Sequence, residues 1–178
     1  MDRLVVFYSY NGSNRYLANR IINELNCASI EIKPILNSRF FLLMGMGFGL
    51  GKVKTDLKKF DQIILVGPIW MGKFIYPLKK FVQKYKNSIR NLSFVTCCGR
   101  KKKKKDEKFG HGLVFNELKN LLPDKSVSCL ALPILLVMPE ELKEDGQAIM
   151  KTRLSDENFK GEILGKFNEL IVSLKNPS

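Results

Sequence analysis

The sequence predicts an α/β domain in which helices cover both faces of a parallel sheet. Five strand-like runs recur along the chain, at residues 4–8, 28–32, 62–67, 92–98 and 127–137. The first, third and fourth runs are apolar throughout and do not alternate, which is typical of strands buried on both faces. Helical repeats lie between the runs and indicate βαβ units with right-handed crossovers. We therefore predict one three-layer, doubly wound domain over residues 1–178, with a five-stranded parallel sheet.

Each helix is predicted from apolar residues that recur three or four positions apart. The repeats place helices around residues 17–25, 78–85 and 114–122, and the clearest one covers residues 159–174. Pro77 suits the first turn of the second helix, where its missing N–H costs nothing. We expect the last helix to begin near Ser155, which precedes two acidic residues.

Charge and cysteine usage narrow the function classes. The formal net charge is +13, from 30 Lys and Arg against 17 Asp and Glu, which favours anionic partners. Cys27, Cys97, Cys98 and Cys129 form no CxxC pair, and His111 is the only histidine. These spacings disfavour a zinc or iron–sulfur site and favour thiols in a reducing cytosol.

The chain shows no sequence pattern for export or for a membrane span. Asp2 and Arg3 lead directly into the first apolar run, without the pattern of a signal peptide. The uncharged run over residues 40–51 is too short for a bilayer, which takes about 20 residues. We therefore expect a cytoplasmic protein, and contact with a membrane surface stays open.

The turn after the first strand is rich in hydrogen-bond donors. It reads Ser9-Tyr10-Asn11-Gly12-Ser13-Asn14 and leads into the first helix, whose N-terminal N–H groups favour an anion. A phosphate monoester would suit this set, while the alternative is that Ser13 or Asn14 only caps the helix. The GxGxxG dinucleotide pattern fails because Gly12 is the only glycine here, and the Walker pattern fails at Val53.

At this turn and at two later ones, the sequence resembles the flavodoxin-like family of FMN-binding proteins. The phosphate loop of that family typically reads [ST]-x-T-G-x-T, and here asparagine replaces both threonines. The stretch DQIILVGPIWMGKFIYPLKKFV (61–82) is similar to the third-strand region of small members, and Thr96-Cys97-Cys98-Gly99 is similar to their second ring-contacting loop. The three motifs follow three strands in the expected order.

The resemblance implies strand order 2-1-3-4-5, FMN as the cofactor and a site at three strand ends. The flavin would carry the redox chemistry, so we expect no catalytic side chain and no metal. Trp70, the only tryptophan, would give the ring a flat wall, and Gly72 and Gly99 would let the backbone approach it. The cofactor-binding residues so implied are Ser9, Tyr10, Asn11, Gly12, Ser13, Asn14, Pro68, Ile69, Trp70, Met71, Gly72, Lys73, Thr96, Cys97, Cys98 and Gly99.

Two segments depart from the pattern of electron-transfer flavodoxins. Those proteins are typically acidic around the flavin, whereas Lys101–Lys105 follow the second ring loop here. The lysines either form a solvated loop or attract an anionic partner, such as a redox protein or a small-molecule acceptor. They lack interleaved aromatic residues, which disfavours nucleic acid. The glycine-rich apolar segment 38–52 is a sheet-covering helix, a lid near the flavin or a foot on a membrane surface.

Three functional interpretations stay open from the sequence. The first is an FMN-binding flavodoxin-like protein that transfers electrons or reduces a quinone-like acceptor. The second is a membrane-associated flavoenzyme, because residues 72–74 also resemble menaquinone-dependent protoporphyrinogen oxidases. The third is a binding module of the same fold without FMN, which the asparagines at 11 and 14 leave possible. The physiological donor and acceptor and the oligomeric state have no sequence signature.

Overall fold

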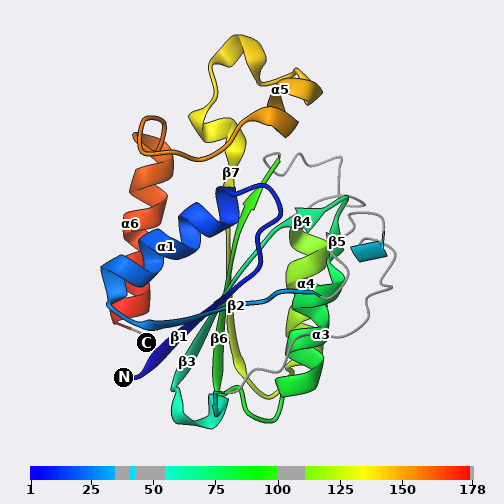
Figure 1. Cartoon of the computed structure of the whole chain (residues 1–178), viewed down its shortest axis with the longest axis vertical. Coiled ribbons are helices and arrows are strands. Elements are labelled where there is room, and N and C mark those ends of the chain that lie inside the picture. Colours follow the sequence, from blue (N-terminus) through cyan, green and yellow to red (C-terminus); the bar gives the residue numbers. More distant parts are fainter. Residues whose placement is uncertain (35–40, 43–54, 100–110, 177–178) are drawn as a thin grey trace.

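A twisted parallel sheet runs through the middle of the computed structural model, which describes residues 1–34, 41–42, 55–99 and 111–176 (Figure 1). Its strands stand in the order β2-β1-β3-β6-β7, and every neighbouring pair is parallel. This confirms the five-stranded sheet and the order 2-1-3-4-5. The bounds are β1 Arg3–Phe7, β2 Ala28–Glu31, β3 Gln62–Val66, β6 Asn91–Cys98 and β7 Ser126–Pro133.

Helices cover both faces of the sheet, as the apolar strands require. Helices α1 (Ser13–Leu25) and α6 (Glu162–Lys175) pack on one face, and α3 (Tyr76–Tyr85) and α4 (His111–Leu121) pack on the other (Figure 1). The side chains of β1 alternate between the two core layers: Val5 points to the α1 and α6 side and Val6 to the α3 and α4 side. Both valines are fully buried, which explains the continuous apolar run.

Several short elements lie at the ends of the strands. β4 (Ile69–Trp70) and β5 (Lys73–Phe74) form an antiparallel hairpin directly after β3. The 3₁₀ helix η1 (Leu57–Lys59) precedes β3, and η2 (Ile134–Val137), η3 (Glu140–Leu142) and α5 (Gly146–Lys151) follow β7. The segment with α5 lies beyond the carboxyl ends of the strands (Figure 1). It therefore belongs to the edge where parallel sheets bind ligands.

Two predicted boundaries are wrong for identifiable reasons. The fifth strand ends at Pro133 rather than residue 137, because its neighbour β6 ends at Cys98, the partner of Pro133, and offers no further pairing. The last helix begins at Glu162 rather than near Ser155. The Ser155 N–H donates to Asn158 Oδ1 at 2.9 Å, and Asn158 Nδ2 donates to the Arg153 carbonyl at 2.7 Å. These bonds fold the intervening residues into turns.

Two sequence features lie wholly or mostly outside the described residues. These are Lys101–Lys105 and all of segment 38–52 except residues 41–42. Among the helices within the described ranges, none combines the length and apolar character needed to cross a bilayer.

Candidate functional site at the carboxyl ends of β1, β3 and β6

The three predicted turns meet at one edge of the sheet. They follow β1, β3 and β6, and β1 and β3 are neighbours in the sheet. The chain leaves β1 for α1 on one face and β3 for α3 on the other. Doubly wound folds bind ligands at such a point, where the chain leaves two neighbouring strands toward opposite faces of the sheet.

The first turn presents an uncapped helix N-terminus. The N-cap of α1 is Gly12, with φ +96°, and no side chain caps the helix there. The Ser9 hydroxyl accepts a hydrogen bond from the Gly12 N–H at 3.1 Å and so folds the turn. The first turn of α1 contains no acidic residue. The capping alternative for Ser13 and Asn14 is therefore wrong, and among the described residues no side chain caps the N–H groups at this helix end.

Ser13 and Asn14 are buried and serve the scaffold of the site. Ser13 Oγ accepts a hydrogen bond from the Leu154 N–H at 3.2 Å. Asn14 holds both polar groups of Cys97: its Oδ1 accepts from the Cys97 N–H at 2.8 Å, and its Nδ2 donates to the Cys97 carbonyl at 3.4 Å. Of the side-chain donors predicted for a phosphate, half-buried Ser9 and exposed Asn11 remain at the surface of the turn.

The hairpin after β3 is locally tight and carries the tryptophan. Trp70 pairs with Lys73, and the two turn residues between them both have positive φ, +49° at Met71 and +68° at Gly72. Positive φ at both positions matches the type I′ turn, whose twist fits a two-residue hairpin. Pro68 is buried and Ile69 half-buried, whereas the Met71 side chain is 67% exposed. The turn therefore projects from the sheet edge.

An aromatic contact joins this hairpin to the first turn. The rings of Tyr10 and Trp70 meet edge to face, with centroids 5.3 Å apart and planes at 87°. Gly67 allows the underlying strand end to pack closely. A Cβ at Gly67 would lie 2.6 Å from Leu78 Cδ1 and 3.2 Å from the Tyr8 carbonyl. The structure thus places Tyr10 beside Trp70, and two of the three turns predicted to form one site lie next to each other.

The end of β6 supplies a buried hydroxyl and two unreactive thiols. Thr96 is fully buried, and its hydroxyl has no hydrogen-bond partner among the residues that the structure describes. Burial raises the pKa of the Cys97 thiol, aided by neighbouring Cys98, and burial raises the pKa of Cys98 to about 12. Burial therefore disfavours the thiolate form of both cysteines.

Residues 145–154 pack against two of the predicted turns, and no motif in the sequence indicates this contact. Asp145 caps α5 by accepting hydrogen bonds from the N–H groups of residues 147 and 148. Ile149 is buried against the end of β6. A Cβ atom added to Gly99, which is exposed, would lie 3.6 Å from Ile149 Cγ2. In the sequence, Asp145 before Gly146 indicates only the start of a helix, because the residues that this segment contacts are distant in the chain.

Comparison with known proteins relates part of the chain to a known family. Residues 49–129 match the flavodoxin domain family. No curated relative matches the sequence of the chain. The matched range contains β3, the hairpin and β6, and so includes two of the three turns at the site.

Solved structures share the fold at low sequence identity. A flavoprotein from Lactobacillus acidophilus in complex with FMN has a TM-score of 0.56 at 16% identity, over 73% of this chain and 91% of its own. An archaeal flavodoxin has 0.55 at 15%, over 98% and 96%. Oxidised flavodoxin 1 from Bacillus cereus has 0.54 at 13%, over 99% and 100%. The resemblance inferred from the sequence is confirmed: the chain has the flavodoxin-like fold, and its residues 49–129 match the flavodoxin domain family.

Proposed function

We propose that this protein binds FMN at the β1 and β3 strand ends and uses it to transfer electrons or to reduce a quinone-like acceptor. The observation that carries the proposal is the contact of Tyr10 with Trp70. This contact joins a turn suited to a phosphate and a hairpin suited to an aromatic ring at one edge of the sheet. The Lactobacillus acidophilus flavoprotein of the same fold was crystallised with FMN, which supports this choice of ligand.

The phosphate would be held mainly by the backbone. The N–H groups at the start of α1 point away from the helix, and the positive end of the helix dipole faces the same way. Gly12 gives the turn its shape, while Ser9 and Asn11 supply a hydroxyl and an amide at its surface. Such a site needs no basic side chain, because neutral N–H donors stabilise the phosphate charge.

The ring would lie against Trp70 and the end of β6. Trp70 supplies an aromatic face, and the turn at Met71 and Gly72 brings backbone close to it. The unpartnered Thr96 hydroxyl fits a ligand that carries several hydrogen-bonding atoms. When bound, FMN supplies the redox chemistry, and the chain positions it and limits its contact with water.

Titration with FMN tests the proposal directly. The protein should quench FMN fluorescence saturably and shift the visible flavin absorbance. Gly12→Val should weaken binding by about tenfold or more, because a β-branched residue resists positive φ and crowds the phosphate.

Gly161→Val is a matched control for the backbone strain. Gly161 is also an N-cap glycine with positive φ, +63°, and a Cβ there meets nothing within 4 Å, as at Gly12. This variant should keep FMN affinity within about twofold of the wild-type value. A colourless protein that leaves FMN fluorescence unchanged would refute FMN binding. Equal losses in both variants would refute the assigned phosphate turn.

A further inference from the structure

The last strand of the sheet, β7, has an outer side that pairs with no other strand. β7 stands at one end of the strand order, and β2 stands at the other. It runs for 8 residues, without a charged residue and without a break in its register with β6. The backbone N–H and C=O groups on its outer side form no hydrogen bond with any residue that the structure describes. An uncharged strand of this length is a template for pairing with a further extended strand.

The strand at the other end of the sheet has the protection that β7 lacks. β2 has only 4 residues, and its Glu31 forms an ion pair with Arg15 of α1. Lys33 and Pro34 follow it directly. Short length, charge and proline are devices by which proteins prevent the outer strands of a sheet from pairing. The contrast between the two outer strands indicates that β7 is the one suited to pairing.

A chain of side-chain hydrogen bonds crosses the sheet and ends on β7. Gln62 Nε2 of β3 donates to Ser93 Oγ of β6 at 2.9 Å, and Ser93 Oγ lies 2.7 Å from Ser128 Oγ of β7. Ser93 is buried, so we assign its hydroxyl hydrogen to the bond with Ser128. Ser128 is exposed, and its own hydroxyl hydrogen has no acceptor among the described residues. The chain therefore ends at the outermost strand with a free donor.

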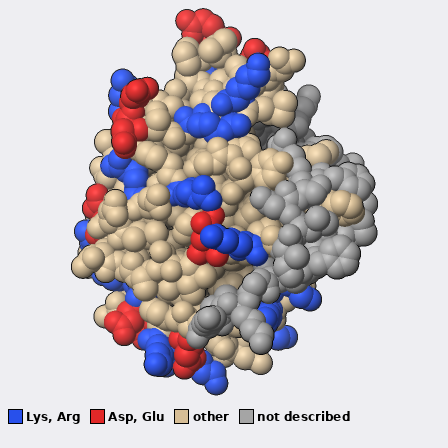
Figure 2. All heavy atoms as spheres, in the orientation of Figure 1, with Lys and Arg blue, Asp and Glu red and all other residues tan. Residues whose placement is uncertain are grey.

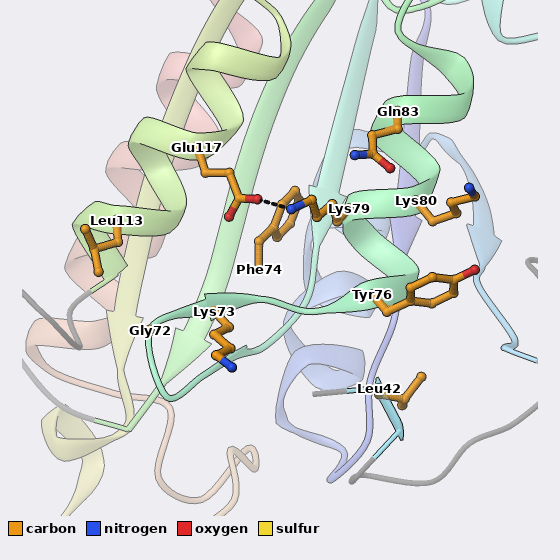
Figure 3. Close-up of a pocket in the computed structure, with 10 residues that line it drawn as sticks. All are labelled: Leu42, Gly72, Lys73, Phe74, Tyr76, Lys79, Lys80, Gln83, Leu113 and Glu117. Atoms are coloured by element: carbon orange, nitrogen blue, oxygen red, sulfur yellow. Dashed lines mark ion pairs between the residues drawn. The ribbon is translucent and has the colours of Figure 1, made fainter. Parts of the chain in front are cut away.

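The surroundings of β7 do not oppose its pairing with a copy of itself. Glu117 is the only acidic residue of α4, the helix that packs beside β7. It points toward α3 and pairs there with Lys79 at 2.6 Å, away from the outer side of the sheet (Figure 3). β7 itself carries no charge, so two copies of it place no like charges opposite each other.

We propose that a second copy of this chain pairs with the outer side of β7, antiparallel to it, about a twofold axis at Ser128. Ser128 of one protomer then lies opposite Ser128 of the partner subunit, and the two hydrogen-bond chains meet. A second copy, unlike an unrelated segment, supplies both this serine and an uncharged strand of equal length. Because the two strands are antiparallel, the carboxyl ends of the two sheets face in opposite directions. The dimer therefore leaves both proposed FMN sites free.

Pairing through one strand should give a weak and reversible dimer. The 8 residues of β7 are fewer than the roughly 20–30 residues that each side of a standard interface contributes. Each copy also carries a net charge of +13, so the two copies repel each other at low salt. We expect a dissociation constant of about 10–100 µM at about 0.15 M salt, and tighter association at about 0.5 M salt, where the repulsion is screened.

Sedimentation equilibrium at protein concentrations from about 1 to 300 µM tests the dimer. The wild-type protein should change from monomer to dimer across this range. Ser128→Lys should raise the dissociation constant by about tenfold or more, because it places two like charges opposite each other at the axis. Ser29→Lys is the matched control, since it makes the same change at an exposed position of β2, and it should have less than about a twofold effect.

Oxidative cross-linking tests the position of the axis. Ser128→Cys should form a disulfide-linked dimer, because residues directly opposite each other on antiparallel strands have Cα atoms about 4.5–5.5 Å apart, within the range of a disulfide. Ser126→Cys lies on the same strand and is equally exposed, but it faces Leu130 of the partner subunit and should not cross-link. The wild-type protein gives the background from the native thiols.

Three outcomes would overturn the proposal. A protein that stays monomeric over the whole range forms no such dimer. Equal weakening by Ser128→Lys and Ser29→Lys would mean that net charge, and not β7, governs association. Equal cross-linking at positions 126 and 128 would exclude an axis at Ser128. The same measurements on protein with and without FMN decide the question independently of the proposed function.

Discussion

At the scale of single residues, Asn14 shows what the local sequence could and could not predict. The sequence correctly placed Asn14 at the turn that begins α1, and it suggested an amide donor for a phosphate. The structure turns this amide toward the backbone of Cys97 instead. The two residues are 83 positions apart. Nothing in the turn itself indicates that partner, because hydrogen bonds between distant segments depend on the completed sheet.

Loss of the Asn14 clamp should destabilise the protein. Asn14→Ala leaves the buried N–H and carbonyl of Cys97 without these partners, which should lower the free energy of unfolding by about 1–3 kcal/mol. Urea denaturation followed by circular dichroism measures the change.

Asn19→Ala is the matched control, because Asn19 is exposed on the same helix and gains the same helix propensity. It should be neutral or slightly stabilising. If both variants have the same stability, the hydrogen bonds to Cys97 contribute nothing measurable.

At the scale of elements, patterns with a local cause were predictable and the rest were not. Apolar runs located all five strands of the sheet, and Pro77 lies in the first turn of α3 as expected. The predicted end of the fifth strand was wrong because the apolar run ILLV continues beyond the point where β6, the strand that pairs with β7, ends. An apolar run predicts that its residues are buried, but it does not predict whether they form a strand or a 3₁₀ helix such as η2.

The β4–β5 hairpin carries backbone strain that a substitution should relieve. Met71 has φ +49°, which is unfavourable for a long side chain, and its side chain is largely exposed. Met71→Asn should stabilise the protein by about 0.5–1 kcal/mol in urea denaturation, because Asn-Gly is a preferred type I′ turn.

Met150→Asn is the control, because Met150 is also exposed but lies within helix α5. It should give no gain, since asparagine is a weaker helix former than methionine. A Met71→Asn protein no more stable than wild type would mean that the turn does not store this strain.

At the scale of the whole molecule, the sheet order and the layers could be predicted, whereas the distribution of charge could not. Order 2-1-3-4-5 places the ends of β1 and β3 side by side, and the structure confirms this order. Figure 2 shows basic side chains interspersed with acidic ones over the face in view, rather than gathered in one patch. The net charge of +13 therefore gives no location for an anionic partner by itself. The densest basic run, Lys101–Lys105, follows β6 in sequence and lies outside the described residues.

Oxidation of the reduced, FMN-loaded protein tests whether this run attracts anions to the flavin edge. Trianionic ferricyanide and an uncharged benzoquinone serve as the two oxidants, and stopped-flow absorbance measures their rates. If Lys101–Lys105 steer anions, replacing all five by glutamine should slow the ferricyanide reaction by about tenfold at about 0.02 M salt. The difference should largely vanish at about 0.5 M salt, because exposed charges are screened there. The benzoquinone rate should not change.

A control variant with the same loss of charge separates local steering from the effect of net charge. It replaces five lysines near the amino ends of the strands, at the edge opposite the proposed site: Lys58, Lys59, Lys86, Lys125 and Lys175. Steering falls off over about one Debye length, roughly 20 Å at 0.02 M salt, so lysines at the opposite edge should affect the ferricyanide rate less. Equal slowing in both variants would mean that net charge alone governs encounter. A benzoquinone rate that falls in parallel with the ferricyanide rate would instead mean that the lysine run affects the flavin site itself.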